Sequence, residues 1–97
     1  MSVKKIIDKN FRGGLYYLNA VPVKVTTNFD DDWLWDYYLE CDYQGVHRKI
    51  TLYFDVMHFE FSGNIEEGSD WCPLNWIEVE QARNFLITNG YLDKDCL

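Results

Sequence analysis

A chain of 97 residues has room for one domain with a single modest core, which we expect to span residues 1–97. Its formal net charge of −7 repels nucleic acid and anionic membranes, which excludes both as direct partners, and it attracts basic surfaces. Aromatic residues make up 18% of the chain, whereas a disordered acidic segment has few, so we expect a folded protein.

The cysteines and the N-terminal residues indicate a cytoplasmic location. Cys41, Cys72 and Cys96 are odd in number, widely spaced and without a CxxC pair, so they predict no disulfide framework. The apolar run that follows Lys4 and Lys5 is only two residues long, which is too short for a signal peptide. We therefore expect a protein of the reducing cytoplasm, without a membrane span.

The first 27 residues are basic and predict a helix followed by an edge strand. They hold five basic residues against one carboxylate. Apolar residues recur at helical spacing over Ser2–Arg12, and Gly13-Gly14 would end that helix. Leu15–Thr27 is rich in β-branched and aromatic residues and predicts a strand. Because Pro22 has no N–H to donate to a ladder, we expect this strand at the edge of a sheet.

A β-hairpin over Trp33–Phe54 is the clearest local signal. From Trp33 to Tyr43 the odd positions are all apolar and the even positions mostly acidic, an alternation typical of a half-buried strand. A two-residue turn at Gln44-Gly45 then aligns apolar pairs on one face and opposite charges on the other. The predicted pairs are Tyr43 with Val46, Leu39 with Ile50, Tyr37 with Leu52, Glu40 with Lys49, and Asp42 with His47. A helix that begins at the three aspartates is the alternative, but it conflicts with this alternation.

Two residues depart from the regular alternation, one inside the hairpin and one just after it. Arg48 falls on the apolar side of the second strand, so we expect it near the turn, where the buried face meets solvent. After Asp55 the alternation changes phase, which indicates a bulge or bend followed by another strand that ends at Gly63.

The last third of the chain predicts an acidic loop and a helix. Asn64–Asp70 contains three carboxylates and the turn residues Gly68 and Ser69. Asn75 and Glu78 are spaced as a capping box, and Asn89-Gly90 is a typical helix end, with Tyr91–Leu97 as a tail. The helix would bury Val79, Ala82, Phe85 and Leu86.

Together these elements predict an α+β fold. We expect a three- or four-stranded antiparallel meander, with a short N-terminal helix and a C-terminal helix packed on it.

No pattern in the sequence indicates catalysis or a bound cofactor. Counted from Asp30, the sixth residue is Trp35 and the twelfth is Cys41, where a calcium loop needs glycine and glutamate. Cys41, His47 and His58 are too widely spaced for a typical zinc site. Cys41 lies on the apolar side of its strand and is expected in the core rather than as a nucleophile. We therefore expect no enzyme, no metal and no cofactor.

The carboxylates after Thr27 are the candidate functional residues. Residues 28–97 hold fifteen carboxylates against four lysines and arginines. One cluster consists of Asp30, Asp31, Asp32, Asp36, Glu40 and Asp42, and a second consists of Glu66, Glu67 and Asp70. Carboxylates on alternate strand positions lie about 6.8 Å apart and predict a row of negative charge that a phosphate-binding groove would accept. The alternative is an ordinary solvated surface.

In size, acidity and Trp- and Tyr-rich composition, the chain resembles the small phage-encoded inhibitors that mimic DNA. It is most similar to the anti-CRISPR proteins directed against type I-F surveillance complexes. The residues behind the resemblance are Asp30-Asp31-Asp32-Trp33, Asp36, Glu40 and Asp42, with the second cluster. The resemblance implies a protein that occupies the lysine- and arginine-lined channel where target DNA enters. We expect a monomer rather than an oligomer.

Two other functions remain open from the sequence. Immunity proteins and antitoxins of barstar type are also small, acidic and aromatic, and they block the basic active sites of nucleases. An enzyme or scaffold whose acidity is incidental is the third possibility. The first two share one expectation, a carboxylate surface that binds a basic nucleic-acid-binding site.

Overall fold

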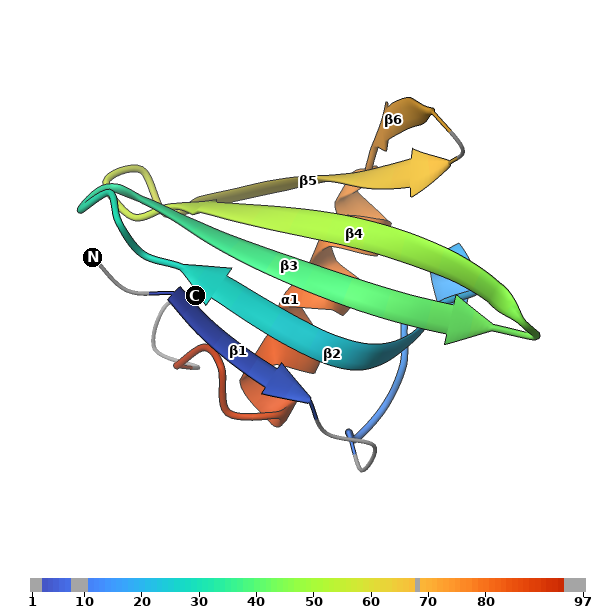
Figure 1. Ribbon diagram of the computed structural model, residues 1–97. Helices are drawn as coiled ribbons and strands as arrows, with labels where there is room; N and C mark the ends of the chain where they lie inside the picture. The colour runs from blue at the N-terminus through green and yellow to red at the C-terminus, as the bar shows by residue number, and fades with distance from the viewer. Residues whose placement is uncertain (1–2, 8–10, 68, 94–97) are drawn as a thin grey trace.

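A computed structural model describes residues 3–7, 11–67 and 69–93 of the chain. Within these ranges, six strands form one antiparallel sheet in which each strand neighbours the next in sequence, and one α-helix lies behind the sheet (Figure 1). The strands are β1 (Val3–Ile7), β2 (Val21–Asn28), β3 (Leu34–Tyr43), β4 (Val46–Asp55), β5 (Glu60–Glu67) and β6 (Asp70–Pro73). The helices are the short 3₁₀ helix η1 (Tyr16–Leu18) and α1 (Trp76–Thr88). The α+β class is confirmed, and the expected count of three or four strands is wrong.

The predicted N-terminal helix is wrong, because β1 occupies its first half. Val3 to Ile7 pair antiparallel with β2, from Val3 opposite Asn28 to Ile7 opposite Lys24. The rest of the predicted helix falls partly on positions 2 and 8–10, outside the described residues. Apolar residues at helical spacing were the basis of the prediction, but a β-branched segment beside an unpaired strand gains ladder hydrogen bonds that local spacing does not reveal.

The strand predicted over residues 15–27 begins only at Val21, and it is not an edge strand. Residues 15–20 instead form a closed turn around η1, with the Leu15 N–H donating to the Ala20 carbonyl and the Ala20 N–H to the Leu15 carbonyl. β2 lies between β1 and β3. Pro22 is tolerated because the described pairs between β1 and β2 do not include it and the register with β3 shifts between Pro22 and Lys24.

The predicted hairpin is confirmed pair by pair as β3 and β4. Leu39 lies opposite Ile50, Glu40 opposite Lys49, and Tyr43 opposite Val46. Gln44 and Gly45 both have positive φ, 49° and 83°, the backbone of a two-residue hairpin turn. Arg48 is half-buried opposite Cys41, next to the turn, as expected of a residue at the boundary between core and solvent.

The segment after Asp55 differs from the prediction in two ways. The expected bend is a full turn at residues 56–59, and β5 continues past Gly63 to Glu67. The expected acidic loop is a second hairpin, in which β5 pairs with β6 from Asn64 opposite Pro73 to Glu67 opposite Asp70. Position 63, in the middle of β5, requires glycine, because a Cβ there would come within 2.6 Å of the Thr51 carbonyl oxygen and 2.9 Å of Leu74 Cδ1.

Helix α1 is confirmed with both of its ends. The Glu78 N–H donates to Asn75 Oδ1 at 2.9 Å, and the Asn75 N–H donates to Glu78 Oε1 at 2.8 Å, which completes the capping box. Gly90 adopts a φ of 82° just past the last turn. The first residues of the expected tail pack on the core, since Leu92 is buried.

The core lies between one face of the sheet and α1. Val25, Leu39 and Ile50 follow one another across β2, β3 and β4, and none of them is exposed. The helix contributes Ala82, Phe85 and Leu86, and the turn around η1 contributes Leu15 and Leu18. The other face of the sheet has no helix over it in the described part of the chain (Figure 1).

Candidate functional site

The predicted carboxylates of β3 lie on the side of the sheet that α1 does not cover. Asp36, Tyr38 and Glu40 are half-buried there, whereas Tyr37 and Leu39, which alternate with them, are buried in the core. We call this side, which carries Lys24, Asp36, Tyr38, Glu40 and Lys49, the open face. The expected division of β3 into a core side and a carboxylate side is confirmed.

Toward the β3–β4 turn, the charges of the open face are balanced. Glu40 Oε2 on β3 lies 3.0 Å from Lys24 Nζ on β2. Lys49 on β4 lies opposite Glu40 of β3 and opposite Glu66 of β5. The hydrogen bond from Lys24 lowers the pKa of Glu40, as do the charges of Lys24, His47 and Lys49. Lysine and glutamate thus alternate across four strands, so Glu40 and Glu66 belong to a mixed surface.

The mixed surface also takes in Asp42 and a shallow hollow. His47 Nδ1 lies 3.3 Å from Asp42 Oδ1 across the hairpin. A hollow of about 290 Å³ is lined by Lys24, Thr26, Tyr38, Glu40 and Lys49. The continuous row of negative charge that the sequence predicts from Asp32 to Asp42 is therefore interrupted at Glu40, because β2 and β4 supply lysines on both sides of it.

The opposite end of the strands is rich in carboxylates. Asp30, Asp31 and Asp32 are exposed in the loop between β2 and β3. Leu34 at the start of β3 lies opposite Asp55, and Asp55 lies opposite Glu60. The Val56 N–H donates to the Trp33 carbonyl at 2.9 Å, which holds the β2–β3 loop beside the β4–β5 turn (Figure 1).

Six carboxylates therefore gather at one end of the sheet, which we call the acidic end: Asp30, Asp31, Asp32, Asp36, Asp55 and Glu60. In the described strands, the residues paired with Asp36, Asp55 and Glu60 include no lysine or arginine. Like charges directly opposite on neighbouring strands, such as Asp55 and Glu60, destabilise a sheet. The fold thus keeps repulsion between carboxylates at the acidic end, whereas lysines on neighbouring strands offset Glu40 at the other end of the same face.

Asp36 is the carboxylate of the acidic end most affected by its surroundings. Its Oδ2 accepts a hydrogen bond from the Tyr38 hydroxyl at 3.1 Å, and its Oδ1 is buried without a hydrogen-bond partner among the described residues. Burial raises the pKa of Asp36, the Tyr38 hydrogen bond opposes that rise, and the charge of Asp31 adds to it.

One histidine belongs to the acidic end. His58 Nδ1 lies 2.9 Å from Asp55 Oδ2, and Asp55 Oδ1 accepts from the backbone N–H groups of Met57 and His58 at 3.1 Å. The hydrogen bond from His58 lowers the pKa of Asp55, and the same contact raises the pKa of His58. The pair shapes the turn between β4 and β5 and offsets part of the negative charge there.

The two predicted clusters are not brought together. Glu66 and Asp70 lie at the β5–β6 hairpin, at the end of the sheet away from the loop of residues 29–33 (Figure 1). Glu67 pairs with Asp70 across that hairpin, and its side chain is outside the description. Of the nine predicted partner-binding residues, the structure therefore groups Asp30, Asp31, Asp32 and Asp36.

Sequence reasoning missed Asp55 and Glu60 as members of this group. Both flank the turn at residues 56–59, which the changed phase of alternation indicates only as a bulge or bend. A full turn would have placed the two carboxylates opposite each other on adjacent strands. The available signal was Asp55 itself, because aspartate commonly bonds to the backbone N–H groups that follow it in a turn.

The structure adds three observations on other chemistry. Burial raises the pKa of the Cys41 thiol to about 12, which keeps it protonated and unreactive as a nucleophile. In the part of the chain that is described, histidine, cysteine and carboxylate side chains form no group of three suited to hold a metal ion. No described helix is long and apolar enough to cross a membrane.

Comparison of the chain with protein-family models, curated proteins and solved structures finds no match.

Proposed function

We propose that this protein is an acidic inhibitor that occupies the basic nucleic-acid-binding channel of a CRISPR–Cas surveillance complex and so blocks the binding of target DNA. The observation that carries the proposal is the acidic end, where six carboxylates gather and where the described strand partners of Asp36, Asp55 and Glu60 include no lysine or arginine. We assign the contact to these six residues. Glu40, Asp42, Glu66, Glu67 and Asp70 take a smaller part or none.

The spacing of the acidic end suits a lysine- and arginine-lined channel. Neighbouring strands lie about 4.8 Å apart, and alternate positions along a strand lie about 6.8 Å apart. The carboxylates are thus spaced both along a strand and across neighbouring strands, so several lysines and arginines of one channel can bind them at once. The charge that costs stability in the free protein is then neutralised in the complex.

The choice of a CRISPR–Cas complex as partner rests on the resemblance of size, acidity and aromatic content to the type I-F inhibitors. A barstar-like protein would use the same surface against a nuclease. The two targets differ in what is displaced, target DNA from a surveillance complex or substrate from a nuclease active site, and this difference can be measured directly.

The test is competition for a purified type I-F surveillance complex. Fluorescently labelled target duplex is added with increasing amounts of the protein, and the bound duplex is measured by anisotropy at several salt concentrations. We expect displacement that weakens as salt rises, because steering by complementary charge is screened. The variant D30K/D31K/D32K should lose most of this inhibition.

A matched control separates position from net charge. D42K/D70K/D93K changes the net charge by the same amount at three exposed positions outside the acidic end, and it should retain most of the inhibition. Equal inhibition by both triple variants, or simultaneous binding of the protein and the duplex, would remove the proposal. Inhibition of a nuclease, with the same dependence on the acidic end, would keep the surface and change the target.

A further inference from the structure

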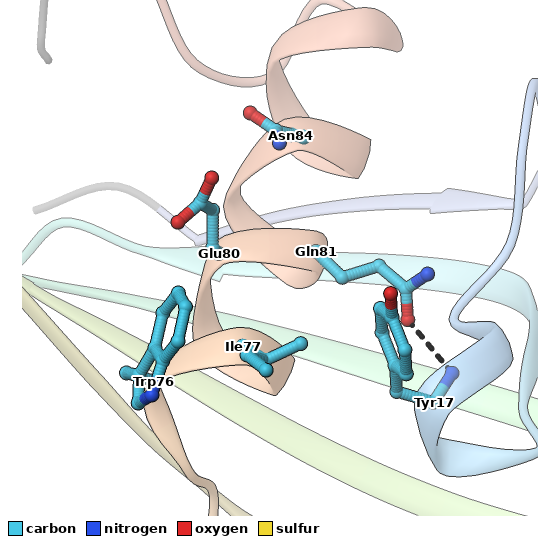
Figure 2. Close-up of a pocket in the computed structure, with 6 residues that line it drawn as sticks. All are labelled: Tyr17, Trp76, Ile77, Glu80, Gln81 and Asn84. Atoms are coloured by element: carbon cyan, nitrogen blue, oxygen red, sulfur yellow. Dashed lines mark hydrogen bonds between the residues drawn. The ribbon is translucent and has the colours of Figure 1, made fainter.

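An exposed aromatic groove lies on the helix side of the molecule, on the other side of the sheet from the open face. It runs between η1 and the first two turns of α1 and has a volume of about 370 Å³ (Figure 2). Trp76 is 74% exposed, Tyr17 is 66% exposed, and Ile77 lies between them in the view. The full lining is Tyr17, Trp76, Ile77, Glu80, Gln81 and Asn84.

The walls of this groove are held in place by the fold. Gln81 Oε1 accepts a hydrogen bond from the Tyr17 backbone N–H at 3.0 Å, which ties η1 to α1 (Figure 2). Leu18, the next residue along η1, is buried in the core. Trp76 is the first residue of α1, directly after the Asn75 cap. The backbones that carry the two aromatic rings are therefore positioned before any partner arrives, which lowers the entropy lost on binding.

The chemistry of the lining favours a cation with a flat, weakly hydrated head. Two aromatic rings provide faces that attract cations, and Glu80, beside Trp76 in the view, provides the counter-charge (Figure 2). Among the described residues, none that lines the groove is basic. Arg12 lines an adjoining hollow that shares Gln81 and Asn84 with the groove. Arg83, which lies over the Phe61 ring at 5.7 Å, lines another hollow that shares Trp76 and Glu80. A second copy of this chain is disfavoured as the occupant, since each copy carries a net charge of −7.

We propose that this groove docks an arginine-bearing segment of a protein partner. The guanidinium stacks on Trp76 or Tyr17 and donates to the Glu80 carboxylate, while its aliphatic stem covers Ile77. Arginine suits the groove better than lysine because its planar head stacks on aromatic faces and carries several donors. The groove is separate from the acidic end, so both surfaces can be occupied at once, and the inference does not depend on the proposed function.

The experiment is an NMR titration of the full chain with a blocked pentapeptide, one arginine flanked by glycine and serine. The indole N–H signal of Trp76, assigned by its loss in Trp76→Phe, and the amide signal of Tyr17 should shift as the peptide is added. The same peptide with citrulline, which keeps the shape and lacks the charge, should bind more weakly. Glu80→Gln should weaken the arginine peptide about two- to fivefold, since both a cation–π contact and an exposed ion pair contribute modestly.

Controls make the outcome decisive. Asp31→Asn removes the same charge at the acidic end and should leave the shifts of Trp76 and Tyr17 unchanged. Trp76→Ala should fold, because this side chain is largely exposed, and should lose most of the binding. Equal binding of the citrulline peptide, an unchanged affinity in Glu80→Gln, or shifts confined to the acidic end would each overturn the proposal. An intact DNA competition by Glu80→Gln would show that the acidic end acts independently.

Discussion

At the scale of single residues, the carboxylates of the acidic end differ in the hydrogen bonds that they accept. Asp55 is compensated by His58 and by two backbone N–H groups, whereas Asp36 has only the Tyr38 hydroxyl on one oxygen. The hydrogen bond from His58 lowers the pKa of Asp55, whereas burial raises the pKa of Asp36, although both residues lie at the same end of the sheet.

The Asp55–His58 pair predicts a defined pH window. The pKa of His58 is raised above its ordinary value of 6.5, so its contribution to stability is complete below that value and is lost as the pH rises through the folded pKa. The pKa of Asp55 is lowered, so its contribution is present above 3.8 and is lost as the pH falls through the folded pKa. The pair therefore contributes most between about pH 4 and 6.5.

An NMR titration of the His58 ring tests this prediction. We expect the pKa of His58 to lie above 6.5 in the natural protein and to fall toward that value in Asp55→Asn. Asp31→Asn removes an exposed carboxylate that makes no bond to His58 and should leave most of the shift. An unshifted His58 in the natural protein would contradict the geometry of the turn.

At the scale of elements, the packing of β5 against β4 and against the segment that follows β6 depends on Gly63. Gly63 on β5 lies opposite Leu52 on β4, with Leu74 above it. The Leu74 N–H donates to the Gly63 carbonyl at 2.9 Å, so the chain that leaves β6 is held directly against β5. The absence of a side chain at position 63 permits this contact, and the chain leads directly from it into α1.

Gly63→Ala is predicted to destabilise the protein. The added Cβ would meet the Thr51 carbonyl oxygen at 2.6 Å, which is backbone and can move only with the strand. We expect a loss of about 1–3 kcal/mol in the free energy of unfolding, measured by urea denaturation. Gly14→Ala is the matched control, because the nearest atoms to its Cβ lie at an ordinary 3.6 Å. A loss in Gly14→Ala as large as that in Gly63→Ala would contradict this account.

At the scale of the whole molecule, charge is segregated along the strands. Lysines from β2 and β4 flank Glu40 in the half near the β3–β4 turn, whereas the described strand partners of Asp36, Asp55 and Glu60 include no lysine or arginine. The net charge of −7 is therefore concentrated rather than evenly spread. A field focused in this way steers a basic partner toward one end of the molecule.

This segregation predicts a salt-dependent stability. The free energy of unfolding at pH 7 should rise as salt increases from about 0.01 to 0.15 M, because the Debye length shortens from about 30 to 8 Å and repulsion at the acidic end is screened. D30N/D31N/D32N should be more stable at low salt by about 0.5 kcal/mol and depend less on salt. Urea denaturation at several salt concentrations measures both. D42N/D70N/D93N has the same net charge and should show the smaller change; the reverse order would contradict the segregation.

The amino-acid sequence determined the central hairpin, α1 and four members of the acidic end. These features depend on residues close in the chain: alternation along β3, a two-residue turn, a capping box whose two residues are three positions apart, and consecutive aspartates. In each case the interacting groups are fixed by local geometry, so the pattern alone specifies the contact.

Only the tertiary structure decided the position of β1, the central place of β2 and the division of the carboxylates into two surfaces. β1 forms where β2 offers an unpaired edge, and Lys24 reaches Glu40 only because β2 lies beside β3. Asp55 and Glu60 join the acidic end through the β4–β5 register, and Trp76 and Tyr17 line one groove because Gln81 of α1 bonds to η1. These contacts join residues distant in the chain, and their energy comes from pairing and burial that exist only once the sheet has assembled.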